Sequence, residues 1–214
     1  MRRIINQERL SWARLVSNLL SPPVIWAVMA FPIAFRDAQT QQQAMIWALI
    51  YCGLVCILPL FYVAMMVRMG RITDLHMQVR QQRLMPFVVS IICTSIAWWV
   101  LRFMGAPAVL PLFALFSLAQ IAVIAVITLV WQISMHAMSI TGAVVAAFTF
   151  FGVIPALLLL PLIVLVGAAR LKLEKHTLAQ IIAGAAVGLI VPLLLFLALE
   201  GAPASLLIAF PKDF

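Results

Sequence analysis

Apolar residues occupy long uninterrupted segments of this chain, and polar and charged residues are concentrated in the short stretches between them. A helix needs about 20 mostly apolar residues to cross the hydrocarbon core of a bilayer. The pattern therefore predicts membrane-spanning helices. The apolar segments are 16–35, 43–67, 86–103, 107–132, 136–170 and 177–199.

The segment 136–170 is too long for one span. As a single helix it would extend about 52 Å, whereas the hydrocarbon core is about 30 Å thick. The stretch FGVIP contains a glycine and a proline, and it predicts a tight turn near Gly152–Pro155. The expected fold is thus an all-α polytopic membrane bundle of about six to seven transmembrane helices.

The first residues follow a different pattern, in which basic and large apolar side chains alternate. The basic residues are Arg2, Arg3, Arg9 and Arg14, and the apolar ones are Ile4, Ile5, Leu10, Trp12 and Leu15. This mixture is typical of a short amphipathic helix lying on a membrane surface. We expect such an interfacial segment over 1–15 and a single transmembrane domain over 16–214.

Composition supports a membrane environment. The 214 residues are 66% apolar and only 9% charged, whereas soluble domains are about half apolar and a quarter charged. The net charge of +8 is more typical of basic cytoplasmic loops than of nucleic-acid binding. We expect an integral, multi-pass protein of the plasma or inner membrane.

The basic residues also predict an orientation. With seven spans, the N-terminus and the loops 68–85, 132–136 and 170–176 lie on one side. That side contains Arg2, Arg3, Arg9, Arg14, Arg68, Arg71, Arg80, Arg83, Arg170, Lys172 and Lys175, against Arg36, Arg102 and Lys212 opposite. Lys and Arg are enriched in cytoplasmic loops, so the first side is predicted to be cytoplasmic.

Residues suited to metal ions are scarce, and we expect neither a metal site nor a cofactor. Cys52, Cys56 and Cys93 lie inside apolar segments, where reduced packing cysteines are expected. The 6 acidic residues form no DxxD or DxxxD pair. Membrane prenyltransferases and alcohol phosphotransferases hold Mg²⁺ with such carboxylates, so the sequence argues against both classes.

Three polar clusters fall on the predicted cytoplasmic side: His76 to Arg83, Ser134 to His136, and Arg170 to His176. Arginine binds phosphate oxygens with a planar fork of donors. One histidine can attack phosphorus while a second protonates the leaving oxygen. Arginine can also neutralise the charge that develops in this reaction. The inventory therefore favours phosphoryl chemistry without a metal.

The spacing of these clusters resembles the type 2 phosphatidic acid phosphatase superfamily over about residues 70–195, as a divergent bacterial-type membrane member. Arg170-x5-His176 resembles its third motif, SRx5HxxxD. The sequence ISMHA, with Ser134 and His136, resembles its second motif, PSGH. The loop ending at Arg83 resembles its first motif, Kx6RP.

The resemblance implies a role for each matching residue. His176 would be the nucleophile and His136 the acid for the leaving group. Ser134, Arg170 and Arg83 would hold the phosphate.

The chain departs from the motifs at several positions. Gln180 stands where the family has the Asp that orients the nucleophile, and His76 replaces the first-motif Lys. Leu84 replaces the Pro of the first motif, and Ala169 replaces the Ser of the third. In the second motif, Ile133 and Met135 replace the Pro and the Gly. Arg80 and Asp74 add charge to the first cluster, and we include Arg80 and His76 among the expected phosphate ligands.

We therefore expect a metal-independent phosphatase that acts through a phospho-histidine. This hydrolase would act on a polyprenyl (di)phosphate or on phosphatidate. Phosphorylated and membrane lipids would be its partners, and nucleic acid would not. One alternative is a relative that binds lipid phosphates without efficient turnover, which Gln180 favours. A small transporter is the other, although the scarcity of charge inside the apolar segments argues against ion coupling.

Overall fold

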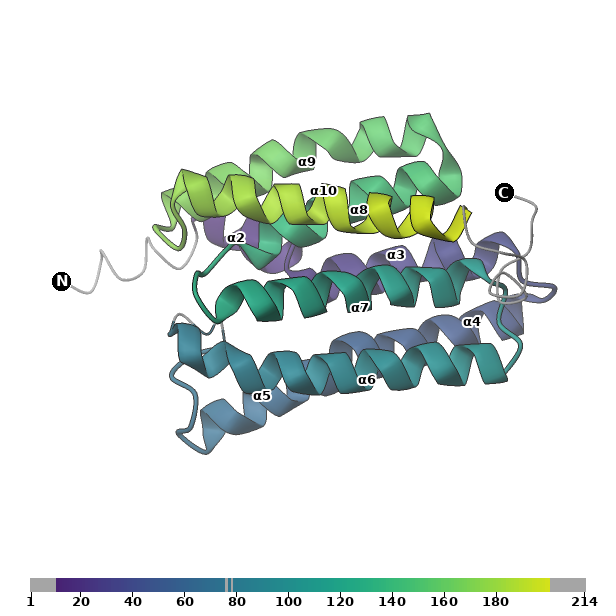
Figure 1. Cartoon of the computed structure of the whole chain (residues 1–214), viewed down its shortest axis with the longest axis horizontal. Helices are drawn as coiled ribbons and strands as arrows, with labels where there is room; N and C mark the ends of the chain where they lie inside the picture. The colour runs from purple at the N-terminus through teal and green to yellow at the C-terminus, as the bar shows by residue number, and fades with distance from the viewer. Residues whose placement is uncertain (1–10, 76, 78, 201–214) are drawn as a thin grey trace.

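Helices form nearly all of the structure, a computed structural model that describes residues 11–75, 77 and 79–200 (Figure 1). No strand occurs among these residues, so the predicted all-α fold is confirmed. In chain order the helices are α2 (Trp12–Leu19), α3 (Pro22–Arg36), α4 (Gln41–Tyr51), the π-helix η1 (Cys52–Ile57), α5 (Leu58–Arg68), the 3₁₀-helix η2 (Arg80–Arg83), α6 (Leu84–Phe103), α7 (Val109–Thr128), α8 (Met135–Phe151), α9 (Val153–Lys172) and α10 (Leu178–Glu200).

The described helices include five that are long and apolar enough to cross a membrane. They are Gln41–Arg68, Arg80–Phe103, Val109–Thr128, Val153–Lys172 and Leu178–Leu199, and the bent pair α2–α3 would make a sixth. Large apolar side chains face outward: Leu158 is 74% exposed and Val164 is 75% exposed. A hydrocarbon solvent accounts for this exposure, and the chain has the architecture of a multi-pass membrane protein.

The long apolar segment 136–170 forms two antiparallel helices, as the sequence predicts. Gly152 alone separates α8 from α9, and its φ of +87° lies in the region that glycine adopts without steric strain. Its N–H donates to the carbonyl of Phe148 at 2.9 Å. The chain therefore reverses direction within one residue.

The first span differs from the sequence prediction. The segment 16–35 is not one helix, because α2 and α3 meet at a bend of 49° after Leu19. Ser21 is extended (φ −73°, ψ 152°) and two prolines follow it. A proline disfavours helical backbone at the residue before it, which explains why the helix breaks at Ser21. The amphipathic helix thus runs to Leu19, past the expected boundary at 15, while residues 1–10 lie outside the described part.

Helix α8 is the centre of the bundle. Most of its side chains are buried, and it packs against α10, α9, α3 and α7. A Cβ on Gly184 of α10 would overlap the carbonyl oxygen of Ser134, and one on Gly188 would overlap the carbonyl oxygen of Met138. The two glycines thus permit α10 to lie directly on the α8 backbone, the use of small residues common in membrane bundles.

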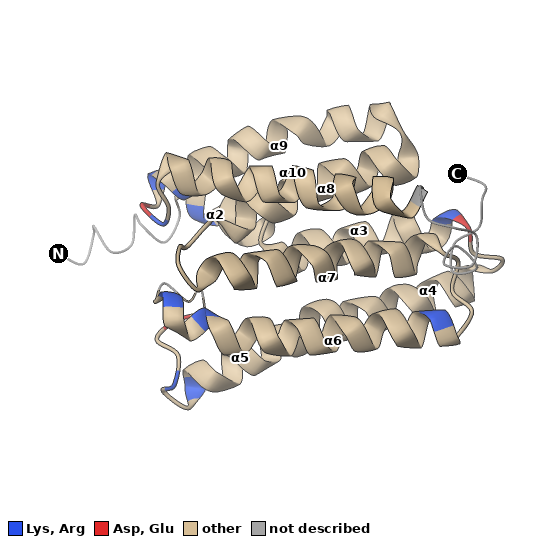
Figure 2. Cartoon of the chain, in the orientation of Figure 1, with Lys and Arg blue, Asp and Glu red and all other residues tan. Residues whose placement is uncertain are grey.

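Charged residues gather at the two ends of the bundle, and the length between them is uncharged (Figure 2). Most Lys and Arg lie at the end that holds the start of α2, the α5–α6 loop and the α9–α10 turn. We call this the basic end. Cys52, Cys56 and Cys93 lie buried as free thiols between the ends.

Candidate functional site

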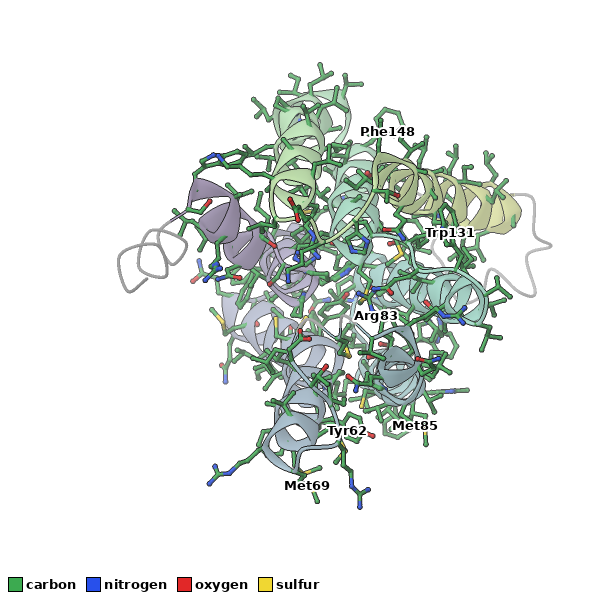
Figure 3. All side chains as sticks on the ribbon, turned by 90° about the vertical axis from the view of Figure 1, so that its left-hand side faces the viewer. Tyr62, Met69, Arg83, Met85, Trp131 and Phe148 are labelled. Atoms are coloured by element: carbon green, nitrogen blue, oxygen red, sulfur yellow. The ribbon has the colours of Figure 1, made fainter. Side chains whose placement is uncertain are left out.

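The candidate site lies at the basic end, which holds three connections between helices. These connections are η2 before α6, the α7–α8 loop and the α9–α10 turn. Seen from this end, Arg83 lies near the middle of the cross-section, and Met69, Tyr62 and Met85 lie at its edge (Figure 3). Arg83 therefore lies near the axis of the bundle, and the side chains of Ser134, His136, Arg170 and His176 are buried as well.

His176 and Gln180 form the best-defined contact of the site. His176 precedes α10, and its Nδ1 lies 3.1 Å from Oε1 of Gln180. The same oxygen accepts the backbone N–H of Thr177 at 3.1 Å. Because this oxygen accepts both contacts, Nδ1 carries the hydrogen. The lone pair of His176 is then on Nε2, which makes no hydrogen bond with the described residues.

Gln180 also caps its helix. Its backbone N–H donates to Oγ1 of Thr177 at 3.4 Å, while its side chain accepts from the N–H of Thr177. This reciprocal pair is a capping box, which satisfies two backbone donors at the start of α10. The sequence T-x-x-Q signals such a cap, and the sequence reasoning missed it. Gln180 thus fixes the helix start and the ring of His176 together.

The surroundings of His176 keep its ring neutral. Burial lowers the pKa of His176 to about 4, and the positive charges of Arg170 and Arg83 contribute to the shift. The hydrogen bond with Gln180 acts in the opposite direction but is outweighed. At neutral pH the ring therefore has a lone pair available.

Arg170 lies in the last turn of α9 and is only 3% exposed. Its Nη1 donates to Oγ of Ser17 at 2.8 Å, and its Nε is buried with no hydrogen-bond partner. The guanidinium therefore hydrogen-bonds to a neutral hydroxyl, and this contact does not compensate the positive charge of Arg170.

Arg83 ends η2 and is 4% exposed. Its Nε donates to the carbonyl of Met77 at 2.7 Å. Arg83 and Arg170 are close enough for each charge to act on His176. Two buried guanidiniums beside one neutral imidazole form a positively charged cluster suited to an anion; together with His136 we call this cluster the positive pocket.

His136 and Ser134 lie at the start of α8. Nε2 of His136 is 3.0 Å from the carbonyl of Ser17, and because a carbonyl only accepts, this nitrogen carries a hydrogen. Ser134 caps α8: its hydroxyl accepts the N–H of Ala137 at 3.3 Å. Its own N–H donates to the carbonyl of Gln180 at 3.0 Å. These bonds hold the second and third motif-like segments together.

Of the remaining expected ligands, Arg80 contacts the end of α7 and His76 is not among the described residues. Nη1 of Arg80 donates to the carbonyl of Leu129 at 2.8 Å, and Leu129 caps the C-terminal end of α7. Among the described residues no group of three His, Cys, Asp or Glu side chains could hold a metal ion.

Ser17 is the site residue that the sequence analysis did not identify. It contacts Arg170 through its hydroxyl and His136 through its carbonyl, although both partners are more than 100 residues away in sequence. The available signal is the i, i+4 spacing of Ala13 and Ser17, the small residues of an amphipathic helix. Both are buried, whereas Trp12, Leu15 and Leu19 are exposed.

Comparisons with protein-family models, curated proteins and solved structures gave no match to this chain.

Proposed function

We propose that this protein binds the phosphate of a phosphorylated lipid at the basic end and hydrolyses it through a phospho-histidine on His176. The observation that supports the proposal most directly is the buried guanidinium of Arg170, which hydrogen-bonds to a neutral hydroxyl. Beside it lies a neutral His176 with a lone pair on Nε2. An anion would supply the missing negative charge, and phosphate oxygens match the donors of arginine.

The proposed reaction uses these residues as follows. The lone pair on Nε2 of His176 forms an N–P bond while the bond between phosphorus and the lipid oxygen breaks. The leaving oxygen takes a proton from the ring of His136. Water then attacks phosphorus and gives a proton to the ring of His136, while the N–P bond breaks with its electron pair returning to Nε2 of His176 and inorganic phosphate leaves. Arg83 and Arg170 stabilise the charge on the phosphoryl oxygens in both steps.

The motif resemblance supports the same reaction class. His176, His136 and Arg170 match the order and spacing of the type 2 phosphatidic acid phosphatase superfamily. A substrate with an acyl or polyprenyl tail suits a bundle whose outer surface is apolar, since the tail can remain in the bilayer. Membership of this superfamily, a polyprenyl (di)phosphate or phosphatidate substrate and a cytoplasmic site are parts of the proposal.

The test is release of inorganic phosphate by the purified protein in detergent micelles with EDTA present. The substrates are phosphatidate, a polyprenyl phosphate and a polyprenyl diphosphate. We expect release from at least one of them, and none by the His176→Ala variant, which controls for contaminating phosphatases. Equal release by the variant, or release only with added Mg²⁺, would overturn the phospho-histidine mechanism.

Anion binding provides a test that does not need turnover. Arg170→Ala should weaken binding of vanadate by about 1.5–3 kcal/mol, the contribution of a charged hydrogen bond. Arg102→Ala is the matched control, since Arg102 lies in the last turn of α6 at the opposite end of the bundle. Equal affinities of the two variants would argue against the site.

A second candidate is a lipid-phosphate-binding protein without efficient turnover. The observation that favours it is the neutral carbonyl of Gln180 on Nδ1 of His176, since a carboxylate there would stabilise the positive charge that grows on the ring. In that case vanadate binds and Arg170→Ala weakens binding, yet no phosphate is released from any of the three lipids.

A further inference from the structure

The positive pocket is closed in this structure. Exposure is 4% for Arg83, 8% for His136, 3% for Arg170 and 7% for His176. A phosphate group needs contact with several of these side chains at once, so some covering element has to move before it can bind.

Helix α2 covers the pocket with Ser17. The Ser17 hydroxyl accepts from Nη1 of Arg170 at 2.8 Å and lies 3.4 Å from Nε2 of His136. The Ser17 carbonyl accepts from the same nitrogen of His136 at 3.0 Å. Two oxygens of one residue therefore occupy the donors that would otherwise face a phosphate, and they do so as neutral, weaker acceptors.

The connection of α2 to the bundle permits movement. Leu20, between α2 and α3, has non-helical backbone (φ −104°, ψ 36°), and the two helices are bent by 49° there. Pro22 and Pro23 fix the first turn of α3 just beyond it. Backbone rotation can thus be absorbed at Leu20–Ser21, while α3 stays in place.

The packing of α2 is also limited. Its main neighbour is α9, against which Ala13 and Ser17 are buried. Near that contact the Lys172 amine lies 5.1 Å from the Trp12 ring centre, and Trp12, Leu15 and Leu19 point outward. An outward apolar face can remain in the membrane interface as α2 shifts, so movement exposes little apolar surface to water.

We propose that α2 is a lid whose Ser17 oxygens occupy the anion subsite, and that the phosphate of a membrane lipid displaces Ser17 from Arg170 as α2 moves about Leu20–Ser21. This inference rests on the proposed function. Substrate phosphate and Ser17 then compete for the guanidinium of Arg170. Removing the Ser17 hydroxyl should therefore tighten binding of the anion.

Vanadate affinity of the full-length protein tests this competition. Ser17→Ala removes the hydroxyl and should bind vanadate more tightly, by about tenfold if one charged hydrogen bond of about 1.4 kcal/mol no longer competes. Ser117→Ala is the matched control, because Ser117 is a fully buried serine whose hydroxyl bonds Tyr51 at 2.6 Å, away from the pocket. Its affinity should equal that of the unaltered protein.

Distances between spin labels test the movement. One label replaces Leu15 on α2 and the other replaces Leu178 at the start of α10, both exposed, after the native cysteines are substituted. We expect vanadate to change this distance and to leave the distance between labels at Leu158 and Leu194, on α9 and α10, unchanged.

The outcomes separate the two proposals. Tight vanadate binding with no effect of Ser17→Ala and no change in the Leu15–Leu178 distance would overturn the lid and leave the proposed function intact. Weaker binding by Ser17→Ala would also overturn the lid, because Ser17 would then assist the anion. Absence of vanadate binding by both proteins would overturn the proposed function together with the lid.

Discussion

Gln180 performs two tasks with one carbonyl oxygen. It accepts the N–H of Thr177, which caps α10, and it accepts Nδ1–H of His176, which sets the tautomer of the ring. A carboxylate at this position could accept the same hydrogen bonds and would also add a negative charge beside the ring. The side chain at position 180 should therefore control the rate of the reaction more than the fold.

The substitution Gln180→Asp should raise phosphatase activity. A difference of about 1.4 kcal/mol at the transition state corresponds to about a tenfold higher rate. Steady-state phosphate release measures the effect, with His176→Ala as the inactive reference. Lower activity in a Gln180→Asp protein of unchanged thermal stability would indicate that the amide itself is needed.

His176 should remain neutral across the physiological pH range. Its pKa is lowered to about 4, whereas an unfolded histidine titrates near 6.5. Between these values the unfolded chain binds the proton and the folded chain does not, so folded-state stability falls as pH decreases through this window. Nitrogen NMR of labelled histidine should show the Nδ1–H tautomer at pH 6. A His176 signal that titrates near pH 6.5 would contradict the buried environment.

At the scale of elements, the site depends on the contact between α8 and α10. Gly184 lets the first turns of α10 lie on the backbone of Ser134, and the N–H of Ser134 donates to the carbonyl of Gln180. Any Cβ at position 184 would push these segments apart. The geometry of the pocket is thus set by a glycine that has no chemical role.

The substitution Gly184→Ala should destabilise the protein by about 1–3 kcal/mol, the usual cost of overpacking a filled contact. Gly53→Ala is the control, because a Cβ on Gly53 would meet nothing within 4 Å. Thermal unfolding in detergent should show a lower midpoint for Gly184→Ala alone. Equal midpoints would show that α10 can shift away from Ser134 at little cost.

Local pattern predicted the elements better than the contacts between them. Apolar length predicted most of the spans and the turn at Gly152, but it missed the break between α2 and α3. The Ser17 contacts join α2 to α8 and α9, and no local pattern encodes such packing. The hydrogen bond from Arg80 to the carbonyl of Leu129 was not predicted either; it forms because a helix terminus offers free carbonyls to a nearby arginine.

At the scale of the whole molecule, the two ends of the bundle differ in charge. Of the described residues at the end opposite the pocket, Arg36 and Arg102 are basic, and Arg36 lies 3.5 Å from the carboxylate of Asp37. The basic end holds Arg14, Arg68, Arg71, Arg83, Lys172 and others. This difference in charge is the basis of the predicted cytoplasmic placement of the pocket, which stays a prediction.

Thiol labelling tests this orientation. A cysteine at exposed Gln81 should resist a membrane-impermeant reagent in intact cells and react in inverted vesicles, after Cys52, Cys56 and Cys93 are replaced. A cysteine at exposed Gln41, at the other end, should show the opposite pattern. Reaction of the Gln81 cysteine in intact cells would place the pocket on the outer face.

The single-residue turn at Gly152 also affects how the chain enters the bilayer during synthesis. Helix α8 has 17 residues and is shorter than the other spans, so alone it is short for a membrane crossing. Helix α9 is apolar over most of its length, and no polar loop separates the two. The pair can therefore enter as one helical hairpin, in which the longer second arm carries in the shorter first arm that bears His136.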